Sequence, residues 1–171
     1  VNVNGGTFDI ATFSDTVGDV TLTSGTITGT TGVLTGTSYA VQSGTVSAIL
    51  AGAVALTKTT SGTVTLSRTN TYTGATTVNA GVLNVQNDQG TGTTAGGVTV
   101  ASGAALELQG GITVGAEALN ISGAGPSGSA ALDNISGNNT WGGTITLGAA
   151  ASIRNQSDTF TINNASAIVT A

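Results

Sequence analysis

A short run of small or polar residues that ends in glycine, called the step below, recurs along the chain at nearly constant spacing. In its clearest copies it follows alternating apolar and polar residues, as in Val20-Thr21-Leu22-Thr23-Ser24-Gly25. The step glycines are Gly6, Gly25, Gly44, Gly62, Gly81 and Gly103. This regular return of short period-two segments is typical of the coils of a β-solenoid, which bury together what one coil cannot. The sequence therefore predicts an all-β fold of stacked parallel strands.

The alternation also predicts which side chains face the inside of the stack. Apolar residues two apart should point inward, and the threonines between them outward, where their β-branched side chains still favour a strand. The expected inward residues are Val20, Leu22, Ile27, Val41, Val46, Val64, Leu66, Val78, Leu83, Val98, Val100 and Leu106.

Beyond Gly103 the pattern is looser but continues. The pattern of residues 98–106 recurs at residues 145–153, a distance that fits two somewhat longer coils. The coil between them should run through residues 119–121 and 132–135, with a loop at 123–128, and residues 160–162 and 168–169 should belong to the last coil. We predict a single right-handed parallel β-helix (β-solenoid) segment over the whole chain, with roughly eight coils of about 18–23 residues each. Because the chain begins with Val and has no Met, we expect it to be an excerpt of a longer repetitive extracellular protein.

An Ala-rich run from Ser47 to Leu56 is the one stretch that could form a helix instead. Gly52 interrupts it, and the residues on both sides keep the period of two, so a strand is favoured. The longest apolar part of this run, residues 48–56, is too short to cross a bilayer as a helix. No membrane insertion of this segment is expected.

Charged residues are scarce, and this scarcity limits the partners. They form 6% of the chain, against about 25% in ordinary domains, and the only cations are Lys58, Arg68 and Arg154. With a net charge of −5 the chain has no cluster of Lys and Arg to neutralise phosphates, which argues against nucleic acid and against an anionic membrane surface.

The same composition leaves little for catalysis. The chain has no His and no Cys, which excludes Ser/His and Cys/His nucleophile pairs and disfavours a zinc site. Asp9, Asp15 and Asp19 fall within one predicted coil and could cluster around a cation such as Ca²⁺, although solvated turn acids are the preferred interpretation. We therefore predict no enzyme, and no catalytic, cofactor-binding or metal-binding residue.

Two polar patterns allow further interpretations. Thr-x-Thr pairs such as Thr21/Thr23 and Thr63/Thr65 could form ranks like those of an ice-binding surface, but their offset is not constant from coil to coil, so outward strand residues are the favoured interpretation. Several asparagines could stack as amide ladders at the turns. These are Asn70, Asn79, Asn84, Asn120 and Asn134.

Residues 56–85 resemble a known family. The matching runs are Leu56-Thr57-Lys58, residues 62–67, Asn70-Thr71-Tyr72-Thr73-Gly74, residues 76–81 and Leu83-Asn84-Val85. They are similar to the autotransporter-associated β-strand repeat of bacterial type V secreted passenger proteins. The resemblance implies a right-handed parallel β-helix, export to the bacterial cell surface, and no catalytic residues. Thr60 and Arg68 stand where the family usually has Gly, so those corners must either adopt ordinary conformations or be rebuilt.

The first functional hypothesis is a non-enzymatic extracellular rod, either a passenger-like stalk or a surface fibre building block. Its partners would be other copies of itself, joined end to end or laterally, or neighbouring coils of the same protein, with contact to a host surface or a polysaccharide also possible. A carbohydrate-binding or carbohydrate-active β-helix is the alternative, and a Thr-rich ice-binding solenoid is the third hypothesis.

Overall fold

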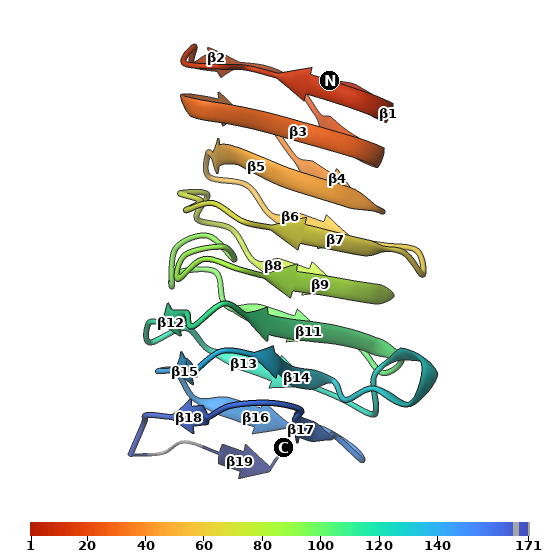
Figure 1. Cartoon of the computed structure of the whole chain (residues 1–171), viewed down its shortest axis with the longest axis vertical. Coiled ribbons are helices and arrows are strands. Elements are labelled where there is room, and N and C mark those ends of the chain that lie inside the picture. The colour runs from red at the N-terminus through yellow and green to blue at the C-terminus, as the bar shows by residue number, and fades with distance from the viewer. Residues whose placement is uncertain (166–167, 171) are drawn as a thin grey trace.

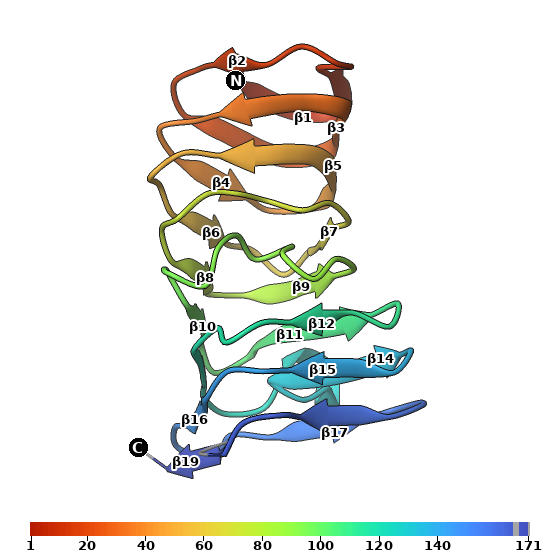
Figure 2. The same cartoon turned by 90° about the vertical axis from the view of Figure 1, so that its left-hand side faces the viewer.

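The computed structural model, described here for residues 1–165 and 168–170, is a stack of coils along one axis. The N-terminal coil lies at one end and the C-terminal coil at the other, and the colour of the chain changes in order from coil to coil (Figure 1). A view from the side shows the same order, with each coil lying on the one before it (Figure 2).

The strands are short, and every ladder between them is parallel. They are β1 (Asn2–Asp9), β2 (Asp15–Thr16), β3 (Val20–Thr35), β4 (Tyr39–Val41), β5 (Gly44–Ala51), β6 (Leu56–Lys58), β7 (Thr63–Leu66), β8 (Thr76–Val78), β9 (Gly81–Val85), β10 (Val98–Val100), β11 (Ala104–Gln109), β12 (Thr113–Val114), β13 (Leu119–Ile121), β14 (Leu132–Ser136), β15 (Asn139–Trp141), β16 (Ile145–Leu147), β17 (Ile153–Asn155), β18 (Phe160–Ile162) and β19 (Ile168–Thr170). A single 3₁₀ turn, η1 (Pro126–Gly128), interrupts them within the described residues.

Each coil contributes a strand segment to two long sides of the stack. The first side starts with residues 2–3 of β1 and continues through the start of β3, then β4, β6, β8, β10, β13, β16 and β19. The second side joins the end of β1 to the middle of β3, then β5, β7, β9, β11, β14 and β17. The chain thus makes eight turns and begins a ninth, which confirms the predicted β-solenoid of roughly eight coils.

The third side is only partly formed by strands. In coils 1–3 it consists of β2 and the ends of β3 and β5, where Asp15 pairs with Leu34 and Leu34 with Leu50. In coils 6–8 it is the three-stranded sheet β12-β15-β18. Between these two parts, residues 67–75 of coil 4 and 86–97 of coil 5 form turns and loops instead.

The core is the column enclosed by the three sides. All twelve predicted inward residues are buried, none of them more than 1% exposed. Tyr39, Tyr72 and Trp141 add large buried side chains to the same cluster. The sequence prediction of the inward face is therefore confirmed.

Coil length varies more than predicted. The advance from Tyr39 to its partner Leu56, which spans coil 3, is shorter than the expected range, and the advance from Leu119 to Ile145, which spans coil 7, is longer. The predicted range is therefore wrong at both ends. Coil 3 is short because β5 runs directly from the second side to the third, whereas β3 has four residues between its two paired parts. Coil 7 is long because the loop around η1 is inserted before β14.

The step glycines stack in the first coils but not throughout. A Cβ on Gly25, at φ +93°, would lie 2.3 Å from the Gly6 carbonyl oxygen, so this close approach requires glycine. Further along, Gly44 pairs with Val64 and Gly81 with Ala104, so the predicted alignment of Gly44 with Gly62 and of Gly81 with Gly103 is wrong. The register instead follows the core residues, and the turns absorb the difference.

The Ala-rich run forms a strand, as favoured. β5 ends at Ala51, Gly52 turns the chain at φ +115°, and β6 begins at Leu56. Across residues 1–165 and 168–170, we find no helix with the length and hydropathy needed to span a membrane.

Candidate functional site: a polar groove on the third side

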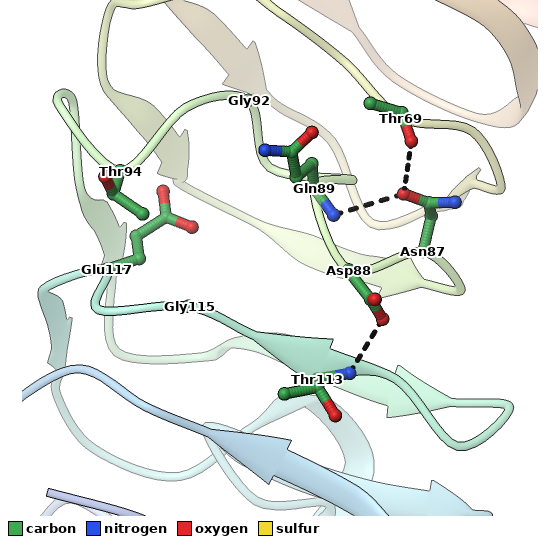
Figure 3. A pocket seen from close by; sticks show the side chains of 9 residues that line it. All are labelled: Thr69, Asn87, Asp88, Gln89, Gly92, Thr94, Thr113, Gly115 and Glu117. Carbon is green, nitrogen blue, oxygen red and sulfur yellow. Dashed lines mark hydrogen bonds between the residues drawn. The ribbon is translucent and has the colours of Figure 1, made fainter.

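Where the third side lacks strands, its loops enclose a cavity of about 380 Å³. The cavity lies between the loop of coil 5 and the start of the third side in coil 6 (Figure 3). Its walls carry hydroxyl, amide and carboxylate groups, together with two glycines. The lining residues are Thr69, Asn87, Asp88, Gln89, Gly92, Thr94, Thr113, Gly115 and Glu117.

The side chain of Asn70, which follows the lining residue Thr69, links neighbouring coils. Asn70 is buried, its Oδ1 accepts a hydrogen bond from the Leu50 amide at 2.9 Å, and its Nδ2 donates to the Gly90 carbonyl at 2.6 Å. One amide side chain thus connects coil 3 to coil 5 and takes the place of the backbone ladder that a strand would supply. Asn70 thus bonds to backbone groups and not to another amide side chain, so the predicted amide ladder is wrong at this position.

Three further side chains, those of Thr69, Asn87 and Asp88, order the wall of the cavity. Thr69 Oγ1 donates to Asn87 Oδ1 at 3.0 Å, and the same oxygen accepts the Gln89 amide at 3.1 Å. Asp88 Oδ1 accepts the Thr113 amide of the next coil at 2.7 Å (Figure 3). The loop of coil 5 is therefore tied to both of its neighbours through side chains.

Glu117 is the most unusual group in the cavity. The residue is 2% exposed, and its Oε2 accepts a hydrogen bond from Thr91 Oγ1 at 2.6 Å. Its Oε1 is buried without a hydrogen-bond partner among the residues that the structure describes. Figure 3 shows the carboxyl group pointing toward the loop that carries Thr94 and Gln89. Burial raises the pKa of Glu117 to about 7, against the effect of the Thr91 hydrogen bond, which lowers it.

The surroundings of Glu117 explain why it stays inside. It is in phase with the inward residues Leu119 and Ile121, and its carbonyl accepts the indole N–H of Trp141 at 2.9 Å. On the inner side, Thr91 and Thr76 connect it to Tyr72: Thr76 Oγ1 donates to the Thr91 carbonyl, and it lies 2.7 Å from the Tyr72 hydroxyl. A buried polar chain therefore runs from coil 4 to coil 7.

A second hollow, of about 310 Å³, adjoins the first. It is lined by Thr30, Thr31, Ile49, Arg68, Thr69 and Asn87, and it shares the last two residues with the first cavity. Arg68 Nε is buried there and has no hydrogen-bond partner in the described part of the chain. We refer to the two hollows together as the side groove. Its linings come from coils 2–6, with Arg68 in one hollow and Glu117 in the other.

Lys58 is a buried charged group away from the side groove. It follows Leu56 by two residues and so points inward, where its Nζ donates to the carbonyls of Thr59, Thr60 and Ala80 at 2.7, 2.8 and 2.9 Å. Desolvation lowers the pKa of Lys58 to about 8. Because three carbonyls match the three N–H donors of an ammonium group, Lys58 stabilises the corner that contains Thr60.

The two departures from the family pattern differ in structure. Thr60 adopts φ +67°, the left-handed conformation that favours glycine, so this corner keeps the glycine-like backbone although it carries a side chain. Arg68 is not among the residues with positive φ, so its corner uses a conformation open to ordinary residues. The expectation of ordinary conformations is therefore correct at Arg68 and wrong at Thr60.

The three N-terminal acids do not form a common site. Asp9 accepts the Ala11 amide, Asp15 accepts the Thr16 amide, and Asp19 accepts the hydroxyls of Thr37 and Ser38. The hydrogen bonds from Ser38 and Thr37 lower the pKa of Asp19. Over residues 1–165 and 168–170, no three Asp, Glu, His or Cys side chains group closely enough to hold a metal ion.

The outward threonines and the asparagines form only partial ranks. Thr7, Thr26, Thr45 and Thr65 pair in register, but Asn84, Glu107, Asp133 and Arg154 continue the row. Among the asparagines, Asn134 Nδ2 donates to Asn155 Oδ1 of the next coil at 2.6 Å, and Asn84 Nδ2 donates to Glu107 at 3.0 Å. Asn79 and Asn120 are exposed. The predicted stacking of one asparagine on the next is thus confirmed at Asn134, and Asn84 Nδ2 also donates to the Gln109 amide oxygen of the next coil at 3.3 Å.

Sequence reasoning did not single out Glu117 or Lys58, although a signal for both was present. Each lies two residues from an inward leucine, so the period-two rule that assigned the core also assigns these charged side chains inward. The side groove left no such signal, because its walls come from loops of different coils.

Comparison with known proteins gives a match in the middle of the stack. Residues 56–85, which make up coil 4 and the first two strands of coil 5, match the family model described as Passenger-associated-transport-repeat. The comparisons with curated proteins and with solved structures found no match. Over residues 56–85 the chain is therefore similar to a passenger-associated-transport-repeat, and the parallel stack of coils around this match fits a repeat protein of the autotransporter-passenger kind.

Proposed function

We propose that the chain is a stretch of the extracellular rod of an autotransporter passenger, with a structural and adhesive role at the bacterial cell surface. The observation that carries this proposal is the position of the family match. Residues 56–85 are not a separate module: β6 to β9 pair on both sides with coils before and after them. A repeat of passenger proteins therefore lies inside an unbroken rod.

The physical properties of the stack suit this role. Each coil contacts only its neighbours, so length is gained by adding coils without rebuilding a core. Because the strands pair in parallel from coil to coil, the rod advances about 4.8 Å per coil, or about 40 Å over eight coils. Charged groups are few, with three cations and eight acids in 171 residues, which leaves hydroxyls and amides for contact with other surfaces.

Self-association belongs to the same proposal. Among the residues that the structure describes, β1 and β19 each pair with one strand only, so their outer edges offer backbone groups to another coil, of this protein or of a second copy. Ile168 pairs with the inward Ile145 and is 48% exposed, so the core is open at this end.

Surface display is tested in the parent protein, expressed in its own cells, with an epitope inserted after Ser127. This residue is exposed in the η1 loop, away from the core. We expect an antibody to label intact cells and added protease to remove the label. Labelling that requires permeabilised cells would contradict the proposal.

A polysaccharide-binding role is a second candidate, favoured by one observation. The side groove consists of two adjoining hollows with mostly polar linings, which share Thr69 and Asn87, rather than a flat strand face.

A further inference from the structure

We propose that the side groove binds a neutral saccharide chain that lies along the rod axis. This inference deepens the proposed adhesive function and rests on the extracellular placement of the rod. It is carried by two buried, unpartnered polar atoms in adjoining hollows. Arg68 Nε is a hydrogen-bond donor, and Glu117 Oε1 is an acceptor.

Unpartnered buried polar groups are rare in folded proteins because their desolvation is not compensated. Of the four such side-chain atoms in the described residues, Arg68 Nε and Glu117 Oε1 belong to residues that line the side groove. A ligand with hydroxyl groups can satisfy both, because a hydroxyl donates one hydrogen bond and accepts others.

The lining of the groove separates ligand classes by chemistry. Apart from glycines, Ile49 is its one apolar residue, so a bound peptide would find no pocket for apolar side chains. One guanidinium stands against two carboxyl groups, a balance that disfavours a polyanionic chain. Thr69, Asn87 and Gln89 supply neutral hydroxyl and amide groups between the charged ends, as the hydroxyls of a saccharide require.

A divalent cation is the other ligand that oxygen-rich walls suggest. Ca²⁺ needs six to eight oxygens within about 2.6 Å. Asp88 already accepts the Thr113 amide, and Figure 3 shows its carboxyl group directed toward Thr113 while Glu117 lies on another side of the hollow. The two carboxyl groups are therefore not arranged as a common coordination shell.

The extent of the groove indicates a chain rather than a single sugar. Its lining residues run from Thr30 in coil 2 to Glu117 in coil 6. Four steps between coils correspond to about 19 Å along the axis. Several sugar units can lie over this length, each facing a different coil.

The test is isothermal titration calorimetry of the whole chain with neutral hexasaccharides of glucose, mannose and galactose. The disaccharide of each sugar is titrated for comparison. Hexagalacturonate and CaCl₂ form the other two arms. We expect one or more neutral hexasaccharides to bind with a Kd on the order of 1 mM or below, and the matching disaccharide to bind about tenfold more weakly.

Variants then place the binding in the groove. Glu117→Gln replaces the carboxylate with a neutral amide, a weaker acceptor, and Arg68→Gln removes the guanidinium; each should weaken binding about tenfold. Gln89→Leu alters an exposed wall residue and tests the groove if either buried variant does not fold. Glu107→Gln is the matched control: it removes a carboxylate outside the groove, and it should leave the Kd unchanged.

The outcomes are distinct. The proposal is overturned if no neutral hexasaccharide binds up to about 10 mM, if only hexagalacturonate or only Ca²⁺ binds, or if binding is insensitive to Glu117→Gln, Arg68→Gln and Gln89→Leu. Surface labelling of the epitope-tagged parent protein is independent of these results, so failure of saccharide binding would leave the rod proposal standing.

Discussion

Thr60 combines a β-branched side chain with a left-handed backbone. Its φ of +67° places the Cβ close to the following carbonyl, a conformation that costs an ordinary residue about 1–2 kcal/mol. Lys58 compensates by donating a hydrogen bond to the Thr60 carbonyl at 2.8 Å. The corner thus keeps the backbone that glycine would adopt and adds a buried ammonium to hold it.

Replacing Thr60 with Gly should therefore stabilise the chain. Glycine relieves the backbone strain energy of the folded chain, and this gain exceeds the cost of the conformational entropy that glycine adds to the unfolded chain. The hydrogen bond lost with the substitution, from Thr60 Oγ1 to the Gln42 carbonyl, is exposed and long, at 3.2 Å. We expect the free energy of unfolding to rise by about 0.5–1 kcal/mol in urea titrations. Thr59→Gly is the control: since Thr59 is not among the positive-φ residues, it should lower stability by a similar amount. Equal effects of both variants would contradict the strain argument.

Glu117 should give the rod a pH-dependent stability with a definite sign. Its pKa is about 7 when folded, against an ordinary value of 4.5, so the folded chain keeps a proton that the unfolded chain has released between these values. The contribution of Glu117 to stability is therefore intact below pH 4.5, falls as pH rises toward 7, and stays lost above it.

Glu117→Gln removes this titration, so the two proteins should differ most at pH 8 and least near pH 4. The Gln variant should gain stability relative to the parent across that range, as measured by thermal unfolding at each pH. A constant difference between the two proteins at all pH values would show that Glu117 ionises in the fold as it does in the unfolded chain.

At the scale of the elements, coils 4 and 5 keep their place without strands on the third side. Backbone bonds such as Thr71 N–H to the Leu50 carbonyl and Thr93 N–H to the Tyr72 carbonyl continue the ladder between loops. Side chains supply the remaining links, and Asn70 is the one that bridges three successive coils. The same loops form the side groove, so its shape depends on this amide.

Asn70→Ala should destabilise the chain by about 2–3 kcal/mol, because the Leu50 amide and the Gly90 carbonyl would both lose a buried partner. Hydrogen exchange should show the loss first in residues 67–75 and 86–97. Asn79→Ala, at an exposed position, should change stability by less than about 0.5 kcal/mol. Loss of protection spread evenly over all coils would argue against a local role for Asn70.

At the scale of the whole molecule, the described coils form a rod whose first and last strands, β1 and β19, each pair on one side. At the C-terminal end, Ile168 continues the inward row of Ile145, whereas its neighbour Val169 continues the outward row of Thr146. Another coil could therefore cover Ile168 but would pass beside Val169. Substitutions at Ile168 and Val169 can therefore distinguish end-to-end association from non-specific hydrophobic association.

Ile168→Lys should reduce self-association, because it places a charge at the open end of the core. Light scattering over a range of protein concentrations should show the unsubstituted 171-residue chain forming larger species, and the Ile168→Lys variant should be shifted toward the monomer. Val169→Lys adds the same charge on the outer face and should associate like the parent. A strictly monomeric parent chain would remove the end-to-end part of the proposal.

Much of this architecture could be predicted from the sequence alone. Period-two alternation correctly predicted every expected inward residue. Successive side chains of a strand point to opposite faces, so the side that each one faces follows from its position in the strand and not from distant partners. The recurrence of residues 98–106 at 145–153 predicted the pairing of Val98 through Leu119 with Ile145, since equivalent segments of a repeat stack on each other.

The tertiary structure decided what depends on neighbouring coils. Gly81 pairs with Ala104 rather than Gly103 because the fit of the core residues Leu83 and Leu106 sets the register, and flexible turns absorb the slip. The side groove arises because two coils lack a strand on one side, and its polar groups come from widely separated parts of the sequence, from Thr30 to Glu117. Local pattern thus determined which way each side chain points, while the packing of one coil on the next determined which side chains meet.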